Sequence, residues 1–213
     1  MGLCPGTAPD NLKGGGYPMR AARISAPKQF EFIDIDPPAM EDGQCLIRLE
    51  GWSVCGSDIR HGYGPIYPEE QYPMRSGGGC HECIGTVVES RTSEFNEGQR
   101  VIVLPDRNGP GGLVEYLASY PERMVAVPGD GTPAEWVMCQ PSGTVLYACQ
   151  QMGTILGKSV LILGQGSIGL SFTAICARAG ASKNTIPTAS ARTVRAPTKD
   201  RIVRYMMISY FVF

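Results

Sequence analysis

Two short segments of the sequence carry side chains that can bind a metal ion. The first reads Cys55-Gly56-Ser57-Asp58, and the second reads Cys80-His81-Glu82-Cys83. Thiolate and imidazole groups suit zinc, and a catalytic zinc commonly has three protein ligands and one open position for water or substrate. Next to Cys55, Ser57 offers a hydroxyl able to pass a proton, and Asp58 offers a carboxylate able to orient a ligating histidine. The two segments therefore predict a zinc site that includes Cys55 and His81.

A glycine-rich run is the second chemical signal. It reads Gly164-Gln165-Gly166-Ser167-Ile168-Gly169, directly after the apolar segment 159–163 and before a helical pattern that ends at Gly180. Between a buried strand and a helix, such glycines allow close backbone approach to a pyrophosphate, which the helix N-terminus favours. The same glycines could also serve a tight strand–helix turn alone. The context favours dinucleotide binding, with contacts from Gly164, Gly166, Ser167, Ile168 and Gly169.

Short strands are the elements expected to position the metal ligands. A hairpin is predicted over 20–35, and further strands over 44–52, 84–89, 100–104, 113–118 and 124–127. In the segment 44–52, Cys45, Ile47 and Leu49 share one face, as in a half-buried strand. The segment 56–79 is rich in Gly, Pro and Tyr and is predicted to be a long loop, which is usually functional in a compact domain. Many short strands separated by turn signals predict a compact, barrel-like β domain over residues 20–128.

The pattern changes near Pro128. Residues 133–152 are predicted to be helical, with a new helix starting at Pro141 because proline suits a first turn. Residues 159–163 form a continuous apolar run, as in a buried parallel strand. The predicted organisation is a lead-in over 1–19, a mostly β domain over 20–128, an incomplete α/β segment over 129–181 and a tail over 182–213.

The composition is that of a globular protein. Of 213 residues, 43% are hydrophobic and 18% are charged, which argues against a disordered chain. A net charge of −1 gives no reason to expect a nucleic-acid partner or an anionic membrane. The N-terminal residues show no secretory signal, and the longest apolar run, 206–213, is too short to cross a bilayer. We therefore expect a cytoplasmic chain whose eight cysteines are reduced and serve packing or metal binding.

Taken together, these motifs resemble the medium-chain dehydrogenase/reductase family, specifically its zinc-containing alcohol and polyol dehydrogenases. The resemblance extends over about residues 20–181 and includes Gly98-Gln99-Arg100-Val101 and Gly111-Gly112-Leu113-Val114-Glu115-Tyr116. It implies a mostly β GroES-like barrel followed by the start of a Rossmann domain. It also implies zinc and NAD or NADP as cofactors, and hydride transfer between the nucleotide and a small alcohol or polyol.

The resemblance also implies roles for single residues. Cys55 and His81 resemble the zinc ligands, Ser57 the hydroxyl that relays the substrate proton, and Asp58 the partner of the ligating imidazole. Glu82 resembles the carboxylate that lies against or on the metal. The position of the third ligand, typically Cys or Glu in the family, is occupied here by Gln140, whose carbonyl oxygen is a neutral and weaker ligand.

The chain departs from the family pattern at further positions. Cys80 replaces the usual glycine before the histidine, and Arg60 stands where many members have a relay histidine, so His61 receives no catalytic role. The four-cysteine lobe of a structural zinc is also missing, because residues 105–110 contain no cysteine. The zinc expected from the sequence is therefore the catalytic one alone.

The C-terminal region lacks the acidic residue expected about 20 positions after the glycine loop. No Asp or Glu occurs between Trp136 and Lys199. Lys183, Arg192 and Arg195 could instead accept the 2′-phosphate of NADP. Alternatively, the tail is unrelated sequence and the remaining βα units of the nucleotide domain are absent. The second interpretation is favoured, and it predicts a truncated form that binds the nucleotide poorly.

Three alternatives stay open at the level of sequence. The chain could be a non-catalytic GroES-like module that binds metal or a partner, including another copy of itself. It could be a metal-free reductase of the same family, although Cys55 and His81 argue against this. Cys80 and Cys83 could also form a CxxC redox pair, but such a motif normally opens a helix, whereas a strand is expected here.

Overall fold

The computed structural model describes residues 18–64, 67–106, 109–185 and 205–206. The chain forms two compact units, Met1–Cys139 and Gln140–Phe213. The predicted lead-in lies outside the described residues except for residues 18 and 19, and so do Arg192 and Arg195. Within the described part of the chain, none of the helices combines the length and the apolar character needed to span a membrane.

The first unit begins with the predicted hairpin. Strands β1 (Met19–Ala26) and β2 (Gln29–Ile35) pair antiparallel, and Met19 faces Ile35 across the ladder. Lys28 in the connecting turn has a φ of 61°, in the left-handed region that tight turns use. The hairpin is joined to the segment after Gly112, because Ala22 N–H donates to the Leu113 carbonyl at 2.9 Å and Ala21 bridges Val114.

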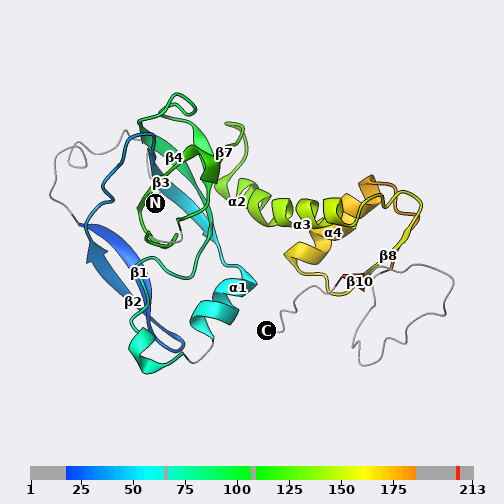
Figure 1. Ribbon diagram of the computed structural model, residues 1–213, viewed down its shortest axis with the longest axis horizontal. Helices are drawn as coiled ribbons and strands as arrows, with labels where there is room; N and C mark the ends of the chain where they lie inside the picture. Colours follow the sequence, from blue (N-terminus) through cyan, green and yellow to red (C-terminus); the bar gives the residue numbers. More distant parts are fainter. Residues whose placement is uncertain (1–17, 65–66, 107–108, 186–204, 207–213) are drawn as a thin grey trace. The chain divides into compact units, whose positions relative to one another are not determined.

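A five-stranded antiparallel sheet forms the centre of the first unit (Figure 1). Its order is β6-β3-β4-β5-β7. The strands are β3 (Cys45–Ser53), β4 (Glu82–Ser90), β5 (Arg100–Val103), β6 (Tyr116–Ser119) and β7 (Met124–Ala126), with the short helix η4 (Pro121–Arg123) between the last two. The predicted strands are therefore confirmed, whereas closure of the sheet into a barrel stays a prediction.

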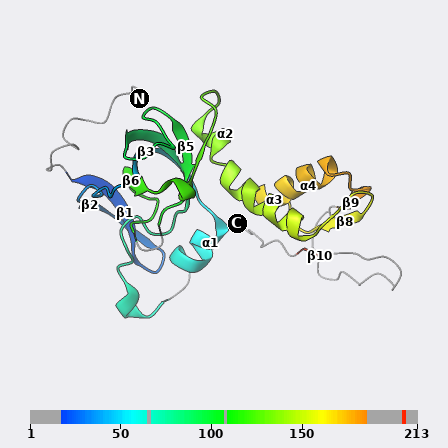
Figure 2. The same cartoon turned by 45° about the horizontal axis from the view of Figure 1, so that its top comes forward.

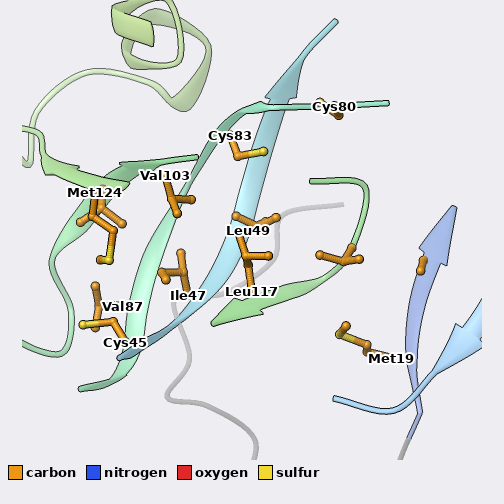
Figure 3. Close-up of a cluster of buried hydrophobic side chains, with 13 residues drawn as sticks. Met19, Cys45, Ile47, Leu49, Cys80, Cys83, Val87, Val103, Leu117 and Met124 are labelled. Carbon is orange, nitrogen blue, oxygen red and sulfur yellow. The ribbon is translucent and has the colours of Figure 1, made fainter. Parts of the chain in front are cut away.

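One face of this sheet packs on a cluster of buried apolar side chains. Cys45, Ile47 and Leu49 of β3 point into it, as their alternation predicts (Figure 3). Val87, Val101 and Leu117 contribute from the neighbouring strands, each with at most 1% of its surface exposed. Full burial of such a side chain stabilises the fold by about 1.5–3 kcal/mol, so this cluster holds in place the strands next to the candidate metal ligands.

The segment predicted as a long loop contains helical turns. It includes α1 (Gly56–Asp58), the π-helical turn η2 (Ile59–Tyr63) and the 3-10 turn η3 (Glu69–Gln71). The first turn forms because the Cys55 carbonyl accepts the backbone N–H groups of Asp58 and Ile59. The abundance of Gly and Pro signals irregular backbone but does not show these local hydrogen bonds, so the sequence prediction missed them.

The first unit ends with a short helix on the second face of the sheet. Helix α2 (Pro133–Trp136) begins at Thr132, whose hydroxyl accepts a hydrogen bond from Glu135 N–H. Trp136 and Val137 pack with Ile84 and Ile102 of the sheet. Helix formation after Pro133 is thus confirmed, and the packing assigns this stretch to the first compact unit.

The second unit is a small α/β arrangement. It contains α3 (Cys139–Gln151), β8 (Ser159–Ile162), α4 (Ser167–Arg178) and the short strands β9 (Lys183–Thr185) and β10 (Tyr205–Met206) (Figure 2). The strands form a parallel sheet in the order β10-β8-β9. Apolar residues of α3, β8 and α4 pack in one cluster that includes Val145, Ile162 and Phe172. β9 and β10 belong to the tail, for which the sequence predicted no element.

Candidate metal centre

The pairing of β3 with β4 brings the two predicted ligand segments together. Ser53 at the end of β3 faces Glu82 at the start of β4. Cys55 follows two residues after Ser53, and His81 directly precedes Glu82. Strand register therefore brings Cys55 and His81, which are 26 residues apart in the sequence, to the same end of strands β3 and β4.

Three predicted ligands converge at this end of the two strands. The Cys55 sulfur, a ring nitrogen of His81 and a carboxylate oxygen of Glu82 all lie within 4.8 Å of one another. One thiolate, one imidazole and one carboxylate form a ligand set that zinc binds in proteins, with distances of about 2.0–2.3 Å from metal to ligand atom. A single ion can therefore contact all three groups after small adjustments.

The environment of Glu82 tests whether a cation fits this site. Glu82 is only 4% exposed. Among the described residues, no hydrogen bond or ion pair satisfies its side-chain carboxylate. A buried carboxylate without a partner is costly, and buried charges are normally paired or coordinate metals. The residues present thus fit a divalent metal ion.

Asp58 connects the two ligand segments. One of its carboxylate oxygens accepts the Cys55 backbone N–H at 2.7 Å, and the other lies 3.0 Å from Nδ1 of His81. Asp58 is 8% exposed. Because Nδ1 is engaged with this carboxylate, Nε2 is the ring nitrogen left for a metal, which is the usual arrangement of a ligating histidine and its carboxylate partner.

The same contact shifts the protonation of the histidine. The hydrogen bond to Asp58 raises the pKa of His81 above its ordinary value, and the negative charges of Asp58 and Glu82 add to this shift against the opposing effect of burial. The protonated ring cannot bind a metal through Nε2. A metal ion and a proton therefore compete for this imidazole.

For two other predicted site residues, Ser57 and Gln140, the structure gives a position in the fold and no more. Ser57 is half-buried in α1, two residues after Cys55. Gln140 is the second residue of α3 and belongs to the second unit. The roles of Ser57 as proton relay and of Gln140 as metal ligand stay predictions.

The surroundings of Cys80 and Cys83 were not anticipated from sequence. Cys83 is fully buried, and Cys80 is 4% exposed with its sulfur 3.4 Å from the Ser53 carbonyl oxygen. The interaction between the two thiols lowers the pKa of Cys80, and the same interaction together with burial raises the pKa of Cys83. Gly112 packs against both residues, because a Cβ atom there would overlap with the Cys83 sulfur and the Cys80 carbonyl oxygen. The Gly111-Gly112 pair was the only sequence signal of this packing.

The glycine loop of the second unit has the predicted position. It follows the end of β8 and leads into α4, whose N-cap is Gly166. Gly164 has a φ of 95°, and Gly169 is packed so closely on the Gly164 carbonyl that a Cβ atom would not fit. Gly166 is exposed, and no described atom lies within 4 Å of the position that a Cβ atom would take there. The loop is therefore closely packed where Gly169 meets Gly164, whereas there is free space at Gly166.

Comparison with known proteins points to one family. Residues 41–149 match the alcohol dehydrogenase GroES-like domain. A zinc-type alcohol dehydrogenase-like protein of Escherichia coli K12 is 28% identical over 192 residues, which cover 76% of this chain and 55% of that protein. L-galactonate-5-dehydrogenase of the same strain is 28% identical over 200 residues, covering 81% of this chain and 57% of that protein.

A solved structure shares the fold. The crystal structure of 2R,3R-butanediol dehydrogenase from Bacillus subtilis superposes with a TM-score of 0.67 and 27% identity, covering 81% of this chain and 58% of the other. The chain spans about half the length of the curated relatives it matches. The family match over residues 41–149 includes Cys55, His81 and Glu82.

Proposed function

The chain belongs to the alcohol dehydrogenase family with a GroES-like domain, and from that premise we propose that it carries the zinc site of an NAD(P)-linked oxidoreductase. The proposed reaction is hydride transfer between a small alcohol or polyol and NAD or NADP. The convergence of Cys55, His81 and Glu82 within 4.8 Å carries this proposal. The zinc-type dehydrogenase among the relatives supports it.

The protein side chains have separate roles in the proposed reaction. Cys55, His81 and Glu82 would hold the metal. A zinc ion bound there supplies Lewis-acid chemistry that lowers the pKa of a substrate hydroxyl. Ser57 accepts the hydroxyl proton and passes it towards solvent, while Asp58 keeps the His81 ring oriented through the 3.0 Å contact at Nδ1.

The second unit would supply the nucleotide site. We propose that β8, the glycine loop and α4 open a Rossmann segment, and that the first unit is the GroES-like barrel of the family. Gly164, Gly166, Ser167, Ile168 and Gly169 then surround the pyrophosphate at the N-terminus of α4. The parallel pairing of β8 with β9 supports this proposal, because nucleotides bind beyond the carboxyl ends of parallel strands.

Zinc analysis combined with a turnover assay tests the proposed function. The purified chain is expected to bind one zinc ion and to reduce NAD or NADP only slowly with a panel of alcohols and polyols. No Asp or Glu lies between Trp136 and Lys199 to hold the adenosine ribose after the glycine loop. Ser57→Ala should lower turnover by about 10²–10⁴-fold, the typical contribution of a proton-transfer group, and leave zinc content unchanged. Zinc binding without turnover on the whole panel would contradict the enzyme proposal and favour a non-catalytic metal-binding module.

A further inference from the structure

The hairpin of β1 and β2 holds the helical turns that follow Cys55. Lys28 N–H in the hairpin turn donates to the Tyr63 carbonyl at 3.1 Å. The Phe30 ring stacks on the Tyr63 ring, with 5.0 Å between the ring centroids and 14° between the ring planes. Tyr63 is the last residue of η2, which continues α1 without a break. Because hydrogen bonds to the Cys55 carbonyl start these turns, the position of Tyr63 constrains where Cys55 lies.

The same hairpin holds the segment that precedes His81. The Ile24 carbonyl of β1 accepts the Met74 N–H at 2.8 Å, and the Ala22 carbonyl accepts the Gly77 N–H at 2.7 Å. These two bonds attach the segment to β1 just before the chain reaches β4. The hairpin therefore contacts both segments that carry candidate metal ligands.

The side chain of Ile24 lies where the two segments meet. Ile24 is 1% exposed. Its terminal methyl carbon, Cδ1, lies 3.2 Å from the position that a Cβ atom would take at Gly62 and 3.4 Å from the same position at Gly79. Gly62 belongs to η2, and Gly79 precedes His81 by two residues. One methyl group thus packs against both segments and constrains the separation of Cys55 and His81.

We propose that the hairpin of β1 and β2 positions the metal ligands, with Ile24 and Phe30 as positioning residues, an inference that rests on the proposed zinc site. Neither residue belongs to the group whose ligand atoms converge, so each acts through the segment that it contacts. Zinc binds sulfur and nitrogen at about 2.0–2.3 Å. A small displacement of Cys55 or His81 therefore weakens binding. By linkage, bound zinc strengthens the contacts of the hairpin in return.

Removal of one methyl group tests the role of Ile24. Ile24→Val deletes Cδ1 and keeps the rest of the side chain. Zinc affinity of the full chain, measured by competition with a chelator, should fall by about 10-fold, as is typical when a group that positions ligands is lost. Ile47→Val is the matched control, since Ile47 is 0% exposed and does not contact Gly62 or Gly79. Both variants should lose similar resistance to urea, but only Ile24→Val should lose zinc affinity.

Two phenylalanines of β2 provide a second matched pair, which also serves if Ile24→Val does not fold. Phe30→Ala removes the ring that stacks on Tyr63. Phe32→Ala removes a ring that is 86% exposed and that stacks on no other ring among the described residues. A stacked ring pair typically contributes a factor of about 2–10 to an equilibrium. Zinc affinity should fall by this factor in Phe30→Ala and stay unchanged in Phe32→Ala.

Two further measurements distinguish positioning from a purely structural role. The charge-transfer absorption of the cobalt-loaded chain reports the bond between the metal and the Cys55 thiolate. At saturating cobalt, this absorption should shift or weaken in Ile24→Val and stay unchanged in Ile47→Val. Hydrogen exchange tests the reverse effect, because zinc should slow the exchange of the Lys28 and Met74 N–H groups in the unmodified chain.

Distinct outcomes separate this inference from the proposed function. If Ile24→Val and Phe30→Ala bind zinc as tightly as the unmodified chain, the positioning role is wrong and the zinc site stands. Equal losses of affinity in Ile24→Val and Ile47→Val would show general destabilisation and would also contradict the positioning role. If the unmodified chain binds no zinc, the proposed function itself fails, and the inference about the hairpin fails with it.

Discussion

The two units of the chain build their candidate sites in different ways. In the first unit, the ligands come from distant segments that β3 and β4 hold together through their register. In the second unit, the glycine loop is a single local connection between β8 and α4. A site of the first kind depends on the whole sheet, because each ligand is placed by pairing with a remote strand. A site of the second kind depends mainly on the backbone of one turn.

The glycines of the two units show the same difference. A Cβ atom at Gly85 would overlap with the Arg48 carbonyl oxygen on the neighbouring strand, so close packing of the sheet requires glycine there. At Gly166, no atom lies near the position that a Cβ atom would take. The first glycine serves the interior of the protein, whereas the second leaves room for a ligand. Four experiments separate these roles, and they are ordered here by the size of the expected effect.

The largest effect is expected for Gly85→Ala. The added methyl group collides with the backbone of β3, and overpacking of this kind typically costs about 1–3 kcal/mol or more. Urea unfolding followed by tryptophan fluorescence measures it, since both tryptophans, Trp52 and Trp136, belong to the first unit. Gly129→Ala is the matched control, because no atom lies near its Cβ position. Equal free energies of unfolding for both variants would contradict the packing argument.

The next largest effect is expected for Asp58→Asn. The amide keeps the shape of the side chain but weakens the contact with His81 and the acceptor for the Cys55 N–H. Loss of such a supporting group typically reduces metal affinity by about 10–100-fold, measured by competition with a zinc chelator. Asp34→Asn, at an exposed position of β2, should retain the affinity of the unmodified chain. An unchanged affinity for Asp58→Asn would show that the bridge between the two segments does not support the metal.

A smaller effect is expected from pH in the metal-free chain. Asp58 raises the pKa of His81 in the folded state, so the folded chain holds this proton more tightly than the unfolded chain. The resulting stabilisation is fully present below the ordinary histidine pKa of about 6.5 and is lost as pH rises through the raised value. Free energies of unfolding across this range should fall in the unmodified chain. The His81→Gln variant should lack this component, and parallel curves for the two proteins would contradict the assignment.

The smallest effect on stability is expected for Gly166→Ala. The site is exposed and has open space, so the free energy of unfolding should change by no more than about 0.5 kcal/mol. The methyl group would nevertheless occupy the space proposed for the pyrophosphate, and NAD(P) binding should weaken in calorimetry. Binding equal to that of the unmodified chain would contradict the role proposed for this loop.

Much of the first unit was predictable because its signals are local. The alternation of Cys45, Ile47 and Leu49 fixed the inward face of β3, and turn residues marked the ends of most strands. The helical turns after Cys55 were missed, since they depend on backbone hydrogen bonds that a Gly- and Pro-rich composition does not indicate. The close packing of Gly112 against Cys80 and Cys83 was also missed, because it depends on a segment that is remote in the sequence.

The candidate site was predictable in part. The spacing of residues identified Cys55, His81 and Asp58, while Glu82 came from the resemblance to a family, and the structure brings all four together. Sequence alone could not show that Asp58 bridges both segments, because its contact with the Cys55 N–H arises from the local turn. In the second unit, the strand, loop and helix followed from a local motif, whereas β9 and β10 have no such pattern.

Zinc-edge X-ray absorption spectroscopy of the zinc-loaded chain is the most direct test of the metal site. With Cys55, His81 and Glu82 as ligands, the first shell should contain one sulfur at about 2.3 Å, with all other ligand atoms nitrogen or oxygen at about 2.0–2.2 Å. The sulfur signal should disappear in Cys55→Ala. A shell with two or more sulfur atoms, or one without sulfur in the unmodified chain, would contradict the proposed centre.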